Sequence, residues 1–132
     1  MQVWAFTVVV PDYDQGIAFY VGKLGFRLVE DTDLGGGKRW VRVQPQGAET
    51  AILLARAVNE RQSASIGNQT GGRVGFFLQT DDFARDHAAF LAKGVVFEED
   101  PRSEPYGIVA VFRDPFGNRW DLLEPAKASP AL

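Results

Sequence analysis

The sequence predicts an α+β fold made of two tandem βαβββ modules, and three observations lead to this prediction. Runs of apolar, β-branched and aromatic residues alternate with helix-like segments in the same order in both halves of the 132 residues. Shifting the chain along itself by 69 positions places Asp12 on Asp81 and Gly25 on Gly94, so the interval from helix cap to helix-ending glycine repeats. A mostly polar stretch separates the halves. Chance alignment of such common residues is the alternative, and the repeated order of elements favours a duplication.

The first module covers residues 3–56. Its apolar run 3–10 predicts a largely buried strand, and a helix follows for which Asp12 or Asp14 can be the N-cap and Gly25 the stop. Strands are then expected at 26–30, 38–43 and 50–55, because turn-forming residues separate these runs. The linker 57–72 is polar and is expected to run over the surface without an element of its own.

The second module covers residues 73–124 and repeats this order. It has a strand at 74–80, a cap at Asp81 or Asp82, a helix at 83–93 ended by Gly94, and strands at 95–98, 108–113 and 119–123. The tail 125–132 is expected to fray. A chain of this length is expected to form one compact domain, 1–132.

Composition limits the classes of function. A hydrophobic fraction of 45% suffices for a core, and a net charge of −3 leaves no basic excess for binding phosphates. We therefore expect neither a nucleic acid nor a membrane as partner, and the start of the chain and the lack of a long apolar run favour a cytoplasmic location. The chain has no cysteine, which removes disulfides and thiolate chemistry. A small molecule or another protein remains as the partner.

Short motifs occur in a characteristic order. Val-Pro-Asp at 10–12 precedes Ala-Phe-Tyr at 18–20 and Lys-Leu-Gly-Phe at 23–26, and Phe-Arg-Asp-Pro-Phe-Gly-Asn stands at 112–118. Together they resemble the vicinal oxygen chelate superfamily, which includes glyoxalase I, bleomycin-resistance proteins, fosfomycin-resistance enzymes and extradiol dioxygenases. The resemblance covers residues 3–124. The segment 114–118 also has a local explanation, because proline, glycine and asparagine favour a turn between two strands.

The resemblance implies that the sheets form a curved half-barrel, with helices on the convex side and a ligand cavity on the concave side. Successive side chains on a strand point to opposite faces. Because Val41 and Val43 are expected under a helix, alternation sends Trp40 and Arg42 to the cavity. The same rule assigns Leu53 to the cavity.

In metal-dependent members of that superfamily, four histidine or glutamate side chains bind a divalent ion. The corresponding positions here are Ala5, Leu53, either Val74 or Gly75, and Asp121, so only Asp121 has a potential ligand atom. We therefore predict no metal and no cofactor. The single histidine, His87, lies on the second predicted helix and is expected to pack or to face solvent.

Asp121 has two interpretations. In the cavity, its carboxylate would orient a cationic or hydroxylated ligand, or act as a catalytic base with a pKa raised by apolar neighbours. Alternatively it forms an ion pair with Arg42 or Arg119.

Aromatic side chains are expected to line the cavity, because they bind flat or apolar ligands. Trp40 and Phe77 are the candidates for its wall, with Phe76 in place of Phe77 if the third metal position is Val74. Tyr106 precedes a predicted strand and is expected at the rim. We expect Trp40 and Asp121 to share one cavity.

Three functions fit these observations. The first is a metal-independent binding protein, similar to the bleomycin-resistance branch, that holds an aromatic or amphipathic small molecule. The second is an enzyme, either a glyoxalase-like lyase or isomerase or a dioxygenase-related protein, that uses Asp121 or an unrecognised metal site. The third is an accessory domain with a vestigial cavity. A homodimer is predicted, because the resemblance implies paired modules and an apolar concave sheet must be covered by a second module or a second chain.

Overall fold

The computed structural model describes residues 1–127 and divides into two compact units. Unit 1 comprises Met1–Asn68, and unit 2 begins at Gln69. The division falls inside the predicted linker 57–72. Each unit has its own sheet.

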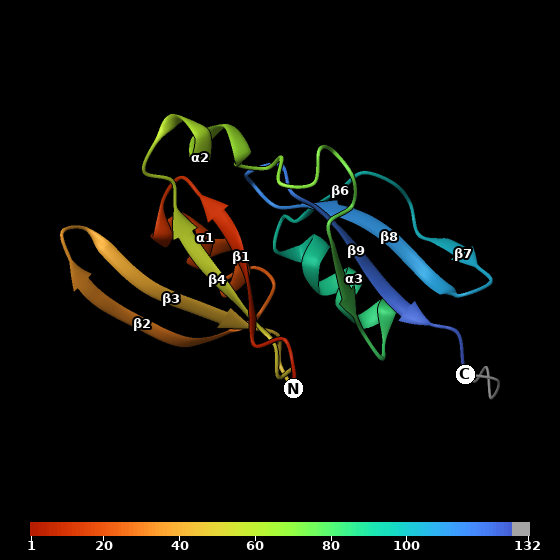
Figure 1. The fold of residues 1–132 in the computed structure, drawn as a ribbon. Helices are drawn as coiled ribbons and strands as arrows, with labels where there is room; N and C mark the ends of the chain where they lie inside the picture. The colour runs from red at the N-terminus through yellow and green to blue at the C-terminus, as the bar shows by residue number, and fades with distance from the viewer. Residues whose placement is uncertain (128–132) are drawn as a thin grey trace. The chain divides into compact units, whose positions relative to one another are not determined.

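Unit 1 is a four-stranded sheet with a helix on one face (Figure 1). The strand order is β1-β4-β3-β2, with β1 parallel to β4 and the other neighbours antiparallel. Its elements are β1 (Ala5–Val10), α1 (Tyr13–Tyr20), β2 (Arg27–Gly35), β3 (Lys38–Gln44), β4 (Ala51–Arg56) and the short α2 (Glu60–Ser65).

Helix α1 begins at the capping residue that the sequence suggests and packs closely on the sheet. The Asp12 carboxylate accepts a hydrogen bond from the backbone N–H of Gln15 at 3.0 Å, so Asp12 rather than Asp14 is the N-cap. Gly16 lets the helix approach β4, because a Cβ atom there would lie 2.9 Å from Cδ1 of the buried Leu54. The buried Val41 is the register partner of Leu54, so both lie on the face that α1 covers.

Unit 2 repeats this plan with one additional strand (Figure 1). The strand order is β5-β9-β8-β6, and β7 also pairs with β8. Its elements are β5 (Phe76–Gln79), α3 (Phe83–Ala92), β6 (Val96–Phe97), β7 (Arg102–Glu104), β8 (Gly107–Arg113) and β9 (Arg119–Pro125). Aromatic rings form the core under α3, where Phe112 meets Phe90 edge-on and stacks on Trp120, and Trp120 stacks on Phe76.

The hairpin between β8 and β9 explains the motif at 114–118. The buried Asp114 carboxylate accepts hydrogen bonds from the backbone N–H groups of Phe116 and Asn118, and from the Asn118 side chain. Gly117 has a φ of 105°, which favours glycine. The motif therefore forms a turn here, as its local explanation predicts.

The predicted fold class is confirmed, and some details of the elements differ from the expectation. The N-cap of α3 is Asp82, whose carboxylate accepts from the N–H of Arg85, and not the repeat-aligned Asp81. Helix α2 lies in the linker expected to have no element, and β7 was not predicted. Pro125 belongs to β9, and the Ala126 N–H donates to the Tyr106 carbonyl, so the expectation of fraying from residue 125 is wrong for these two residues. Its residues 128–132 lie outside the described part of the chain.

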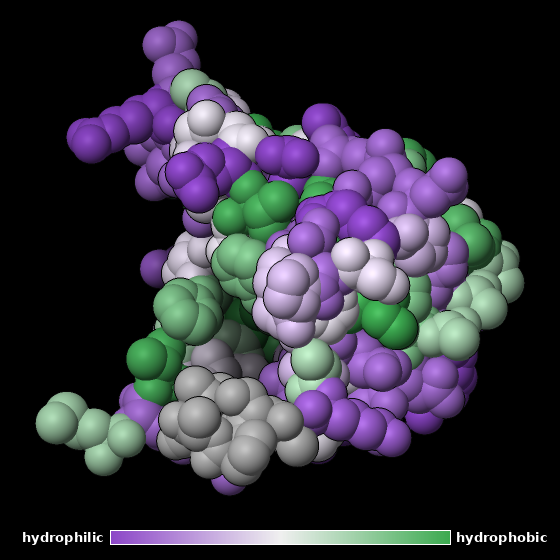
Figure 2. Space-filling model, turned by 90° about the vertical axis from the view of Figure 1, so that its right-hand side faces the viewer, coloured by the Kyte–Doolittle hydropathy of each residue, from purple (hydrophilic) through white to green (hydrophobic). Residues whose placement is uncertain are grey.

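In residues 1–127, no helix is long and apolar enough to span a membrane. On the surface shown in Figure 2, hydrophobic side chains occur as separate patches among hydrophilic ones.

Candidate functional site

Each sheet has one face under its helix and one face turned away from it, which we call the far face of that unit. In unit 1, Val41 and Val43 lie under α1 and are fully buried. Alternation along β3 then places Trp40 and Arg42 on the far face, and Leu53 joins them as the register partner of Arg42. These three side chains are partly buried. The structure thus brings together the three candidates of the first module.

Arg42 contacts an acidic and an aromatic side chain on the far face of unit 1. Its Nε donates to Oε1 of Glu30 at 2.9 Å, and its guanidinium carbon lies 4.2 Å from the centroid of the Trp4 ring. Only 17% of the Arg42 side chain is exposed. Trp4 is a far-face residue that alternation could not identify, because it precedes the first residue of β1.

On the far face of unit 2, Phe77 lies beside Asp121. The two are register partners between β5 and β9, and Val111 of β8 is the other neighbour of Asp121. Phe77 is 66% exposed. Phe76 instead stacks on Trp120 on the α3 side, with ring centroids 4.8 Å apart, so Phe77 is the aromatic residue that shares a face with Asp121.

Asp121 is a partly buried carboxylate without a partner for one of its oxygens. Its Oδ1 is buried, and no described residue donates a hydrogen bond to it. Burial raises the pKa of Asp121, and Glu99 adds to this effect while Arg102 and Arg119 oppose it.

The two arginines suggested as ion-pair partners of Asp121 are engaged elsewhere. Arg42 pairs with Glu30 at 2.9 Å, and Arg119 pairs with Glu98 at 2.9 Å. The ion-pair interpretation of Asp121 therefore finds no support among the described contacts.

Tyr106 lies in the turn between β7 and β8 and is 52% exposed. Nearby, Arg102 bridges Glu99 and Glu104 with hydrogen bonds of 2.8 Å each. The network fixes the hairpin that carries Tyr106.

The four positions that bind metal in metal-dependent relatives do not fit a divalent ion here. Ala5, Leu53 and Gly75 have no donor atom in their side chains, so Asp121 is the one potential ligand among them. Gly75 lies two residues before Phe77, and residues two apart on a strand share a face, so Gly75 and not Val74 corresponds to the third position. In the part of the chain described, no three His, Cys, Asp or Glu side chains are grouped as a metal site would require.

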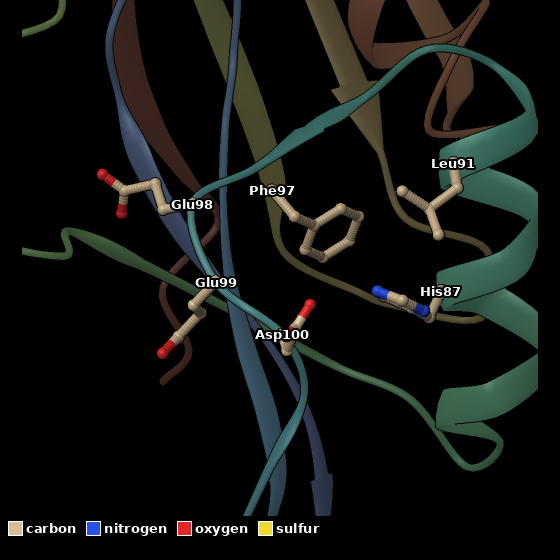
Figure 3. A pocket seen from close by; sticks show the side chains of 6 residues that line it. All are labelled: His87, Leu91, Phe97, Glu98, Glu99 and Asp100. Atoms are coloured by element: carbon tan, nitrogen blue, oxygen red, sulfur yellow. The ribbon is translucent and has the colours of Figure 1, made fainter.

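A separate shallow hollow of about 440 Å³ lies in unit 2 between α3 and the segment that follows it (Figure 3). Its lining residues are His87, Leu91, Phe97, Glu98, Glu99 and Asp100. The His87 ring stacks on Phe83 and meets Phe97 edge-on, as expected for a packing histidine. Glu98 and Glu99 point away from α3 and are held by arginines. Both glutamates are therefore engaged in ion pairs, whereas Asp100 is exposed.

Two open sheets, each with a helix on one face, define a class of small α+β proteins with duplicated βαβββ units. The model of the Glyoxalase/Bleomycin resistance protein/Dioxygenase superfamily matches residues 3–122, and the chain belongs to this superfamily. The resemblance inferred from the motifs is thereby confirmed.

Individual proteins are also similar to this chain in sequence or in structure. An uncharacterized protein of Shewanella frigidimarina (strain NCIMB 400) is 51% identical over 119 residues, which are 89% of this chain and 88% of that protein. The crystal structure of TnmS3, an antibiotic binding protein from Streptomyces sp. CB03234, has 33% identity and a TM-score of 0.77, with 96% of this chain and 97% of that chain covered. A glyoxalase/bleomycin resistance protein from the same organism has 32% identity and a TM-score of 0.72, with 92% and 99% covered.

Proposed function

We propose that the chain is a metal-independent small-molecule-binding protein that holds an aromatic or amphipathic ligand on its far faces. Trp40, Arg42 and Leu53 supply the contacts of unit 1, and Phe77 and Asp121 those of unit 2. Tyr106 contributes from the β7–β8 turn. Support comes from the superfamily and from the likeness to TnmS3, which is an antibiotic binding protein.

The observation that carries this proposal is the buried Oδ1 of Asp121 beside the exposed ring of Phe77. A buried carboxylate oxygen without a hydrogen bond costs about 1–3 kcal/mol of stability, so its retention calls for an explanation outside folding. An exposed aromatic ring next to it supplies apolar contact area at the same place. A ligand with a hydrogen-bond donor and a flat apolar part satisfies both groups.

Native mass spectrometry of freshly purified protein tests the proposal, because it detects a co-purified small molecule whatever the identity of that molecule. We expect a bound mass that Trp40→Ala or Asp121→Asn reduces, while the melting temperature changes little. Asp100→Asn is the matched control, since Asp100 is exposed and lines the separate hollow. If the variants bind as the wild type does, the assigned residues are wrong.

Catalysis by Asp121 is the second candidate function, and the raised pKa of this carboxyl favours it. In a lyase or isomerase of the glyoxalase kind, Asp121 would accept a proton from a carbon next to a carbonyl. Turnover of such a substrate that Asp121→Asn abolishes without loss of binding would establish this candidate over simple binding.

A further inference from the structure

Arg42 is held from two sides and still has unused hydrogen-bond donors. Nε is occupied by Glu30, and the Trp4 ring lies against the guanidinium. In the described residues, neither Nη nitrogen donates a hydrogen bond to the protein. Because the side chain is already fixed, a ligand that bonds to the Nη nitrogens need not order it again.

Arg39, three residues earlier on the same strand, has a structural role and serves as a comparison for Arg42. It lies on the α1 side, where its Nε and Nη2 donate to Asp31 at 3.1 and 2.8 Å, and its Nη1 donates to Asp14 at 2.9 Å. Its guanidinium carbon lies 5.3 Å from the centroid of the Tyr13 ring. Both arginines have an aromatic and an acidic neighbour, but only Arg42 keeps two nitrogens free, and it does so on the far face.

We propose that Trp4 and Arg42 form a carboxylate-binding shelf on the far face of unit 1, and that the bound ligand carries a carboxylate beside a flat apolar group. This inference rests on the proposed function and specifies the ligand class. The free edge between Nη1 and Nη2 matches the two oxygens of a carboxylate. Trp40 and Leu53 share the face with Arg42 and offer apolar surface to the rest of the ligand.

The charges around the shelf favour an anion over a cation. The indole N–H of Trp4 is a donor and cannot accept a hydrogen bond. Glu30 is the acidic neighbour of Arg42, and because it occupies only Nε, a ligand carboxylate can bind without displacing it. A cationic ligand would gain little from Glu30, because the charge of this carboxylate is already neutralised by its ion pair with Arg42.

Two naphthalene probes that differ in charge test this inference. Naphthalene-2-carboxylate and naphthalen-2-ylmethylammonium present the same ring, and titration calorimetry with the full chain gives both dissociation constants. We expect the carboxylate to bind at least about tenfold more tightly, as expected for a charge-assisted pair. Arg42→Gln should remove this preference, and Trp4→Leu should reduce it. Arg39→Gln is the matched control and should retain it.

The three tryptophans supply an independent measurement by NMR. The indole N–H signals of Trp4 and Trp40 should shift when the carboxylate probe binds, whereas that of Trp120, only 3% exposed on the α3 side, should not. Equal binding of both probes by the wild type, or an unchanged preference in Arg42→Gln, would overturn the shelf alone. If neither probe binds at millimolar concentration, the proposed binding function itself is contradicted, and the shelf with it.

Discussion

Asp121 links the pH of the solution to the stability of the fold. Its pKa in the folded protein lies above the ordinary value of 3.8 because burial disfavours the charged form. The folded state therefore binds this proton more tightly than the unfolded state does. The resulting stabilisation is fully present below pH 3.8 and is lost as the pH rises through the folded pKa. At neutral pH the ionised carboxylate opposes folding.

We therefore predict that Asp121→Asn is as stable as the wild type, or more stable, at pH 7. Urea unfolding of both proteins between pH 4 and pH 8 measures the difference in the free energy of unfolding, which should grow in favour of the variant as the pH rises. Comparison with the wild type cancels the opposite effect of Glu98, whose pKa is lowered and which does not act on the pKa of Asp121. A loss of more than about 2 kcal/mol in the variant would instead identify Asp121 as a buried structural partner.

Residues inside regular strands are the ones whose faces the sequence can predict. Alternation places Trp40, Arg42 and Leu53 opposite Val41 because β3 and β4 pair in a regular register. The contact of Glu30 with Arg42 was not predictable, since a register shift between Leu28 and Glu30 changes which side chains of β2 face that way. Trp4 lies outside a strand, where alternation does not apply. Whether Trp40 and Asp121 act on one ligand stays a prediction.

The two long helices depend on aspartate N-caps, and this can be measured residue by residue. Asp12→Ala and Asp82→Ala should each lower the free energy of unfolding by about 1 kcal/mol, because each removes the acceptor for an N–H of the first helical turn. Chemical unfolding measures both effects.

Asp81→Ala is the matched control for the cap of α3. Asp81 is the residue that the repeat aligns with Asp12, but it forms an exposed ion pair with Arg85 at 2.8 Å instead of capping the helix. Its loss should cost no more than a few tenths of a kcal/mol. A larger effect of Asp81→Ala than of Asp82→Ala would contradict the assigned cap.

The elements missed by sequence analysis are those without a hydrophobic pattern. Helix α2 has no buried residue and is started by Asn59, whose side chain accepts from the N–H of Gln62. Strand β7 has three residues and pairs with β8 through its backbone. Such elements depend on local caps and on pairing with neighbouring strands, and the hydrophobic periodicity of the sequence carries no information about either.

For the whole molecule, we predict no stoichiometric zinc, nickel, iron or manganese. Three of the four metal-binding positions have aliphatic side chains or none, and one carboxylate does not hold such an ion. Elemental analysis of purified protein should find far less than one ion per chain, and calorimetry with the same divalent ions should show no tight binding. About one tightly bound ion per chain would require ligands from elsewhere in the sequence.

We also predict that the chain forms a homodimer in solution. The far faces carry apolar side chains such as Leu53 and Phe77, and apolar sheet surface is favourably covered by a second module or a second chain. Light scattering at micromolar concentration should give twice the mass of one chain. A monomer under these conditions would rule out the dimer and leave the fold unaffected.

Strand β2 ends the sheet of unit 1 and has nine residues, long enough to recruit a strand from another molecule. It carries Glu30, Asp31 and Asp33, and its register shifts twice, between Leu28 and Glu30 and between Asp33 and Gly35. Negative charge and bulges on an outermost strand hinder edge-to-edge pairing. We therefore expect β2 to resist edge-to-edge pairing, and we expect neutral replacements of these acidic residues to favour intermolecular β-sheet growth.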